Sequence, residues 1–241
     1  MIKALLDFLL SIKTAFGLFL ICIALCLIGS IVLPANLAFF SGIDDTPLFR
    51  WLSETGHAGL TWWIYAFVAA MAVLALSTVA CTIEALLSRA LRLNLALRLP
   101  TQVMHLGVLL VMLGHLLTAW IGTRVDVPVT KGADAVVTEG VALRLMDVRT
   151  RTDENGYDTD WEADIEADGI KGTLRPARPM GVHGAGLYLK SVTMLKGEAP
   201  TALIGVARDP GAAWALLGGL LVSAGGAGFV LTRRRAAEPQ L

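Results

Sequence analysis

Four long apolar runs constrain this chain more than any other feature of its sequence. They cover residues 14–33, 60–83, 103–121 and 210–232. An α-helix needs roughly 20 apolar residues to cross about 30 Å of hydrocarbon, and each run is about that long. Because unpaired backbone polar groups are costly in lipid, such runs cross a bilayer as helices. The sequence therefore predicts four transmembrane helices.

The composition agrees with a membrane protein. Apolar residues make up 55% of the 241 residues, charged residues make up 17%, and the net charge is zero. This balance differs from that of a soluble globular domain, and the chain has no basic excess that would predict a nucleic-acid partner. Cys22, Cys26 and Cys81 all lie in apolar runs, so we interpret them as packing residues and predict neither a disulfide framework nor a cysteine-based metal site.

The segments around the first two runs are more polar. Residues 1–13 have apolar positions at helical spacing and are predicted to form an amphipathic helix on the membrane surface. Pro34 is expected to end the first helix, which is too long for a signal-peptide core and should remain as an anchor. Residues 35–59 are predicted to be an outer loop with a short helix near 47–54.

Residues 123–209 differ from the rest of the chain because they are charged and their apolar residues alternate with polar ones. Such alternation is typical of half-buried strands, and Asn155-Gly156 and Asp168-Gly169 are turn signals between them. The alternating residues are Val141, Leu143 and Leu145; Trp161, Ala163, Ile165 and Ala167; Leu187 and Leu189; and Ala202, Ile204 and Val206. The predicted fold class is a membrane protein with four transmembrane α-helices and a β-rich extracytoplasmic domain between helices 3 and 4.

Small residues recur at every fourth position of the last run. They are Gly211, Ala215, Gly219, Ser223 and Ala227. A continuous ridge of small side chains lets two helix backbones approach closely in lipid. We therefore expect this ridge to be a helix-packing surface.

The arginines predict the orientation. Arg89, Arg92 and Arg98 lie in the short segment 88–99, three further arginines begin the tail 233–241, and the outer loop has one arginine against three acids. Positive residues stay on the cytoplasmic side of a membrane. Both termini are therefore predicted to be cytoplasmic, and the β-rich domain periplasmic, in a multi-pass protein of the bacterial inner (cytoplasmic) membrane.

Two histidines, His105 and His115, lie in the third apolar run. An ionisable group at this depth is costly and usually faces the bundle interior, a cavity or a ligand. Ten residues of helix correspond to about 15 Å of rise and about −80° of rotation. Two nitrogens on one iron lie only about 4 Å apart, so these histidines cannot ligate one haem together. Each would bind a ligand with a partner from another helix or protein, or make an interhelical hydrogen bond.

The other two histidines give weaker signals. His57 precedes the second run on the outer side and could meet His115 near the outer face, as a second ligand pair. His183 lies in a turn-rich segment and is interpreted as a surface residue. The acidic stretch 153–166 lacks the spacing of a calcium loop and is predicted to be a solvated hairpin. The sequence contains no Ser-His-Asp order, phosphate loop or zinc motif.

The order of these pieces resembles the ResB/CcsB family of cytochrome c biogenesis proteins. The stretches that carry the resemblance are LSIKTA at 10–15, VACT at 79–82, HLG at 105–107 with LG at 113–114, LRLMD at 143–147 with GYDTD at 156–160, GLYL at 186–189 and ARDPG at 207–211. The resemblance implies a role in the system II haem pathway. It implies a CcsA/ResC-like multispan membrane partner with a tryptophan-rich haem-handling motif, which together with this chain attaches haem to apocytochrome c.

The resemblance also implies a site. The family's third-helix histidine corresponds to His105, which would be an axial ligand of the iron of haem b, with the second ligand from the partner. His115 and His57 are less favoured candidates, and His115 has no counterpart in the family pattern. The chain is expected not to be catalytic alone, but to be part of a cytochrome c synthase (haem lyase).

Two other functions stay open at this stage. In the first, the chain is an electron-transfer or quinone-reactive subunit of a respiratory complex, with His105 or His115 as ligands of b-type haems. In the second, it is a structural membrane protein without a cofactor.

Overall fold

The computed structural model describes residues 2–87, 95–136, 141–152, 154, 158–195 and 197–237. The chain divides into two units, a helical one and a β-rich one, which are described separately below. The predictions at Arg89, Arg92 and Asn155-Gly156 lie outside the described residues.

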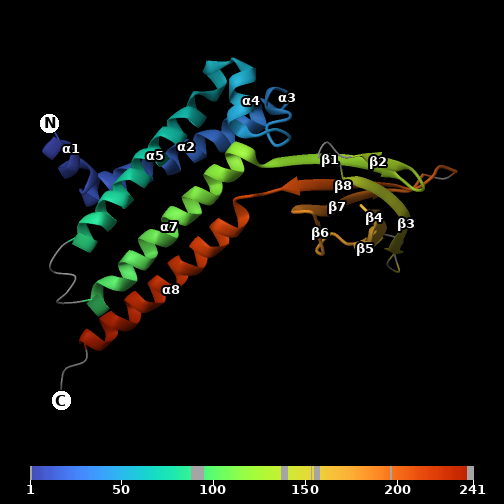
Figure 1. Cartoon of the computed structure of the whole chain (residues 1–241). Helices are drawn as coiled ribbons and strands as arrows, with labels where there is room; N and C mark the ends of the chain where they lie inside the picture. Colours follow the sequence, from blue (N-terminus) through green and yellow to red (C-terminus); the bar gives the residue numbers. More distant parts are fainter. Residues whose placement is uncertain are drawn as a thin grey trace. The chain divides into compact units, whose positions relative to one another are not determined.

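Among its described residues, the helical unit contains four long helices, which Figure 1 labels. They are α2 (Ile12–Ala35), α5 (Ala58–Leu87), α7 (Leu95–Ile121) and α8 (Ala212–Ala237). Each is long and apolar enough to cross a membrane. The described strands lie between α7 and α8 in the sequence, so the predicted fold class is confirmed.

The first long helix does not end where its proline predicted. Pro34 lies inside α2, which continues to Ala35. Asn36 ends the helix, because its side-chain amide donates to the carbonyl of Val32 at 2.9 Å and its backbone N–H donates to the carbonyl of Leu33 at 3.1 Å. These bonds satisfy carbonyls that a helix end leaves unpaired. A proline so close to the end removes a single helical hydrogen bond, which the last turn tolerates.

The amphipathic N-terminal segment forms α1 (Ile2–Leu9), which packs against α5. The hydroxyl of Ser77 on α5 donates to the carbonyl of Leu9 at 2.5 Å, and Ser77 is only 1% exposed. The last carbonyls of a helix have no partner within it, so this bond both caps α1 and joins it to α5. The segment therefore belongs to the helical unit.

Two short helices lie in the segment 35–59. The helix α4 (Leu48–Thr55) is the one predicted near 47–54, whereas α3 (Leu37–Phe40) lies where only loop is predicted. Phe40 stacks on Trp51 with ring centroids 5.7 Å apart, and both side chains are buried. Stacked aromatic rings bury a large apolar area and fix the two short helices to each other.

The helices α7 and α8 lie side by side (Figure 1), and glycines line their contact. A methyl group on Gly107 would lie 2.7 Å from the carbonyl oxygen of Gly218, and one on Gly114 would lie 2.7 Å from the carbonyl oxygen of Gly211. Further along, Gly225 faces Met104 and the carbonyl of Pro100. The two helices are thus antiparallel, and their backbones approach so closely that the contact has no room for a Cβ atom.

The predicted ridge of small residues is wrong in its second half. A methyl group on Gly219 would meet no other atom within 4 Å, and Gly219, Ser223 and Ala227 are all exposed. The buried glycines instead recur every seventh residue, at Gly211, Gly218 and Gly225. Steps of four residues rotate by about 40° around a helix, whereas steps of seven drift by only about 20°. A long contact between nearly antiparallel helices therefore follows the seven-residue spacing.

The described strands of the β-rich unit form two antiparallel four-stranded sheets. The order of the first is β1 (Thr123–Thr130), β8 (Thr201–Arg208), β7 (Ala185–Thr193) and β6 (Met180–Val182). The order of the second is β2 (Asp134–Val136), β3 (Ala142–Thr152), β4 (Asp158–Ala167) and β5 (Ile170–Leu174). Residues from both sheets form one hydrophobic core.

The predicted alternation of these strands is confirmed. Leu145, Ile165, Leu187 and Ile204 are at most 1% exposed, whereas Tyr188, between two core residues, is exposed. The Asp168-Gly169 turn between β4 and β5 is also confirmed. Its two residues have φ of 47° and 80°, the left-handed conformation that a tight hairpin turn requires.

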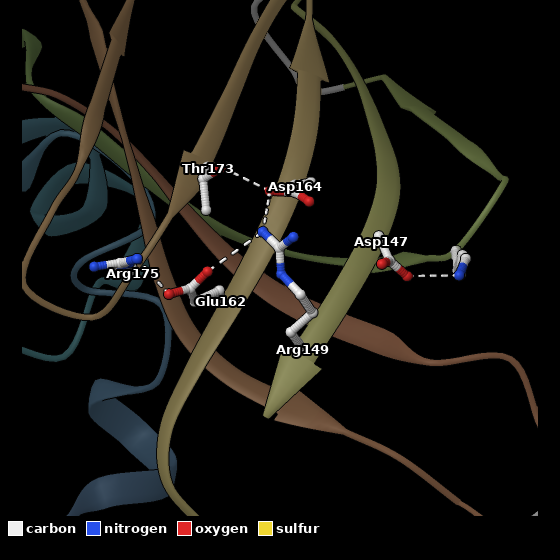
Figure 2. A network of polar contacts seen from close by, with 7 residues as sticks. Asp147, Arg149, Glu162, Asp164, Thr173 and Arg175 are labelled. Carbon is white, nitrogen blue, oxygen red and sulfur yellow. Dashed lines mark hydrogen bonds and ion pairs between the residues drawn. The ribbon is translucent and has the colours of Figure 1, made fainter. Parts of the chain in front are cut away.

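The outer face of the second sheet carries a ladder of charges (Figure 2). Arg149 on β3 contacts two carboxylates of β4, Glu162 at 3.3 Å and Asp164 at 2.9 Å. On the other side of β4, Thr173 donates to Asp164 at 2.6 Å, and Arg175 pairs with Glu162. Two acids of β4, Glu162 and Asp164, are therefore paired with positive charges from neighbouring segments. Cross-strand pairs of opposite charge are favourable in sheets.

From two ion pairs of the same sheet we can predict how the stability of this unit depends on pH. Hydrogen bonds from Arg144, at 2.6 Å, hold the pKa of Asp134 below its usual value. A hydrogen bond from Lys131, also at 2.6 Å, lowers the pKa of Asp147. A folded-state pKa below the unfolded one stabilises the fold at neutral pH, and this contribution is lost as the pH falls through the folded pKa.

We therefore expect an Asp134→Asn, Asp147→Asn double variant of the full chain to be less stable than the wild type at neutral pH. The gap in melting temperature should close as the pH falls below about 4, the ordinary pKa of an aspartate. The effect should be small, because both ion pairs lie on the solvent-exposed surface. Glu198→Gln, at an exposed acid without an ion pair among the described residues, is the control. Parallel pH profiles of the double variant and the wild type would contradict the assignment.

Candidate functional site

His105 lies on the side of α7 that faces away from α8. It precedes Gly107 by two residues, which corresponds to about 200° around the helix. The side chain is half-buried, and its Nδ1 atom lies 3.5 Å from the hydroxyl oxygen of Thr82 on α5. The glycine contact with α8 therefore leaves the His105 side of α7 free to face α5.

The direction of the contact between Thr82 and His105 follows from a second hydrogen bond. The hydroxyl of Thr82 donates its one proton to the carbonyl oxygen of Thr78 at 2.8 Å. A carbonyl can only accept, so the oxygen of Thr82 has only lone pairs to offer His105. A hydrogen bond across this contact therefore requires the proton on Nδ1, the ring nitrogen that faces Thr82. In a neutral imidazole this leaves the lone pair on Nε2.

An imidazole in this state suits haem iron. Neutral histidine that coordinates through one nitrogen and donates a hydrogen bond from the other is the usual form of a histidine ligand. No hydrogen bond engages Nε2 of His105 in the described part of the chain. The chain can thus supply one axial ligand at this position. Among the described residues, no three of the His, Cys, Asp and Glu side chains lie close enough together to hold a metal ion, and the three cysteines are free.

Gln102 lies one turn before His105, about 60° from it around α7. Its side-chain oxygen is buried and has no hydrogen-bond partner among the described residues. A buried acceptor without a partner costs roughly 1–3 kcal/mol. Gln102 thus places a second polar group on α7 within one turn of His105.

The sequence reasoning missed both Thr82 and Gln102. Thr78 and Thr82 are four residues apart in an otherwise apolar run, so a polar stripe on the second helix was visible in the sequence. Which side of the third helix the stripe would meet depends on the rotation of two helices about their axes, which the sequence pattern leaves open.

His115 and His57 are both exposed, and no contact joins them within the described residues. The ring of His57 instead lies edge-on to Phe39, with centroids 5.6 Å apart. His115 follows the buried Gly114 and makes no hydrogen bond in the described part of the chain. No contact among the described residues therefore supports a ligand pair of His57 and His115 on the outer side, and this pair stays a prediction.

His183 lies in the turn between β6 and β7, where its φ of 47° places it in the left-handed region. Its side chain is 67% exposed, and Nε2 lies 3.8 Å from the carboxylate of Asp168. The interpretation of His183 as a surface residue is confirmed.

Comparison with known proteins adds little information about the family or the function of this chain. No protein-family model and no curated protein matches the chain. Among solved structures, "Cytochrome c Heme Lyase CcmF" is similar with a TM-score of 0.47 and 17% sequence identity. The match covers 68% of this chain and 30% of that chain, so this chain spans less than a third of that protein. A likeness at this level assigns neither a family nor an activity to the chain.

Proposed function

We propose that this chain is a haem-delivery subunit of a system II cytochrome c synthase. It would act with a CcsA/ResC-like multispan partner and deliver haem b to apocytochrome c. The observation that carries the proposal is His105, a half-buried imidazole on an apolar helix whose Nδ1 faces Thr82 and whose Nε2 is unengaged among the described residues. The order of sequence motifs that resembles the ResB/CcsB family supports it.

In this proposal haem is the cargo. His105 would hold the iron through Nε2, and the partner would supply the second axial ligand. A site divided between two chains releases its cargo when the chains separate or when one ligand is exchanged. The half-buried position of His105 suits such a divided site, because the ring is held on the side of α5 but is not enclosed.

The proposed orientation places this site near the cytoplasmic side. His105 lies about 9 Å along α7 from Leu99, the first residue of the membrane-spanning part, at about 1.5 Å a residue. With both termini in the cytoplasm, that depth belongs to the inner leaflet, where haem made in the cell would arrive. The β-rich unit would then lie in the periplasm, where cytochrome c acquires its haem.

The test is the haem content of the purified chain, co-expressed with its partner. The wild type should show a b-type absorption spectrum, and His105→Gly should lower the bound haem at least about tenfold. Added imidazole should restore the spectrum of His105→Gly, because it can replace the missing ligand in the space that glycine leaves. His115→Gly, on another side of the same helix, is the matched control. A wild-type protein without haem would overturn the proposal.

The alternative, a b-type electron-transfer or quinone-reactive subunit, is favoured by one observation. His115 lies at a second depth of α7, about 15 Å of helix rise from His105, with its side chain exposed. Two stacked haems would need two such positions. Two quinol-reducible haems per chain, lost separately in His105→Gly and His115→Gly, would establish this alternative, whereas one haem that depends on His105 alone and is not reduced by quinol would exclude it.

A further inference from the structure

We propose that Thr82 is the positioning residue of the His105 site. By accepting a hydrogen bond from Nδ1, Thr82 fixes both the tautomer and the orientation of the ring, so that Nε2 is the nitrogen available for coordination. The orientation of the ring is a property of the chain alone, and only its consequence for haem rests on the proposed function.

The hydroxyl of Thr82 is well placed to act as a fixed acceptor. Threonine is stiff about χ1, and on a helix its hydroxyl bonds the carbonyl four residues before it. Thr82 does so with the carbonyl of Thr78 at 2.8 Å, so the backbone of α5 holds its oxygen in place. The same oxygen lies 3.5 Å from Nδ1 of the His105 ring on α7. The result is a directed chain of donors, from the N–H of His105 to the hydroxyl of Thr82 and from there to a backbone carbonyl.

Because the surroundings are apolar, the contact between Thr82 and His105 strongly affects which nitrogen of the ring carries the proton. In the apolar part of a membrane no bulk water can replace a missing partner of a ring N–H. Which imidazole nitrogen carries the proton is set by the hydrogen bond that the other nitrogen makes or lacks. Without the hydroxyl of Thr82, Nδ1 would have no acceptor on α5 among the described residues, and the tautomer with the proton on Nε2 would be favoured. That tautomer has no lone pair on Nε2.

The chain offers a matched control for this test. Thr78 lies one turn before Thr82 on the same helix, and its hydroxyl donates to the carbonyl of Leu74 at 2.9 Å. Its side chain contacts no histidine among the described residues, and only its carbonyl takes part in the donor chain. Replacing either threonine by valine keeps the shape and removes one hydroxyl, but only the change at Thr82 removes the acceptor of His105.

The first experiment is ¹⁵N NMR of the full-length chain without haem, in detergent micelles, with ¹⁵N-labelled histidine. The chain has four histidines, so a background with His57→Gln, His115→Gln and His183→Gln leaves the signals of His105 alone. In this background, the chain with Thr82 intact, the Thr78→Val variant and the Thr82→Ser variant should all show the proton on Nδ1. Thr82→Val should move it to Nε2. The same tautomer in Thr82→Val as in the parent would overturn the inference.

The second experiment titrates haemin into complexes of the partner with the same variants, with the wild-type histidines restored. Loss of the residue that orients a metal ligand typically lowers affinity about 10- to 100-fold. We expect this loss in Thr82→Val, little change in Thr78→Val, and recovery in Thr82→Ser, which a merely structural role of the methyl group would not give. Equal haemin affinity in Thr82→Val and the wild type would overturn the inference and leave the proposed function standing. A wild type that binds no haemin would overturn the proposed function, while the NMR result still decides whether Thr82 fixes the ring.

Discussion

Cells whose only copy of this chain carries His105→Ala are expected to lose covalently attached haem from their c-type cytochromes, to about a tenth of the wild-type level or less. Alanine cannot coordinate iron, but it is the best helix former and should leave α7 intact. The ring of His105 makes one contact across to α5, so its removal should not unfold the helical unit. The measurement is haem staining of a denaturing gel, in which only covalently bound haem stays with its protein.

Two controls make this result specific to the site. His115→Ala and His57→Ala alter exposed histidines and should leave cytochrome c assembly close to the wild-type level if His105 is the delivery ligand. The amount of His105→Ala protein in the membrane, measured by immunoblotting, should equal that of the wild type. Undiminished cytochrome c assembly in His105→Ala, at normal protein levels, would show that His105 is not the delivery ligand.

The periodicity of the sequence predicted most of the fold. Long apolar runs have few structural solutions in lipid, and alternation in 123–209 leaves only one face of each strand apolar. Leu145 and Ile165 are buried for this reason, and both were predicted from neighbouring residues alone. The end of α2 was harder to predict. Pro34 is the expected end of the helix, but Asn36, two residues later, ends it through the hydrogen bond of its side chain to the carbonyl of Val32.

The candidate site was only half visible in the sequence. His105 was identified because an ionisable residue in an apolar run is costly in itself, whatever surrounds it. Thr82 is an ordinary uncharged residue, and its importance comes from the side of α7 that it meets, where His105 lies. That side depends on how α7 is rotated, and the rotation is set by packing against α8.

The packing of α8 shows why such a rotation is difficult to predict from the sequence. Gly218 and Gly219 are adjacent, so spacings of four and seven residues are both present in the sequence. Only the contact with the backbone of α7 shows which of the two spacings forms the packing surface, because Gly218 lies against Gly107 whereas Gly219 is exposed. The glycine face of α7 also fixes the opposite face, because His105 lies about 200° from Gly107. The contact that holds α7 to α8 thus directs the ligand toward α5.

Substitution at these two neighbouring glycines is expected to have the second large effect. Gly218→Leu is expected to destabilise the helical unit by about 3 kcal/mol or more, the upper range for overpacking of a tight contact. Even the first carbon of the new side chain would lie 2.5 Å from the carbonyl oxygen of Gly107 and 2.7 Å from the backbone nitrogen of Val111. Backbone atoms cannot move aside as side-chain ends can, so the two helices would have to separate.

Gly219→Leu is the matched control, because it introduces the same side chain one residue later on the same helix. Its side chain would enter open space on the exposed side of α8, and it should be neutral or slightly stabilising, since leucine has a higher helix propensity than glycine by up to about 1 kcal/mol. Unfolding of the full chain in mixed micelles with increasing dodecyl sulfate would measure the stability of both variants.

Haemin affinity should fall in Gly218→Leu and not in Gly219→Leu, because displacing α7 also displaces His105 from Thr82. Equal stability of the two variants would show that the glycine contact does not hold α7 in place.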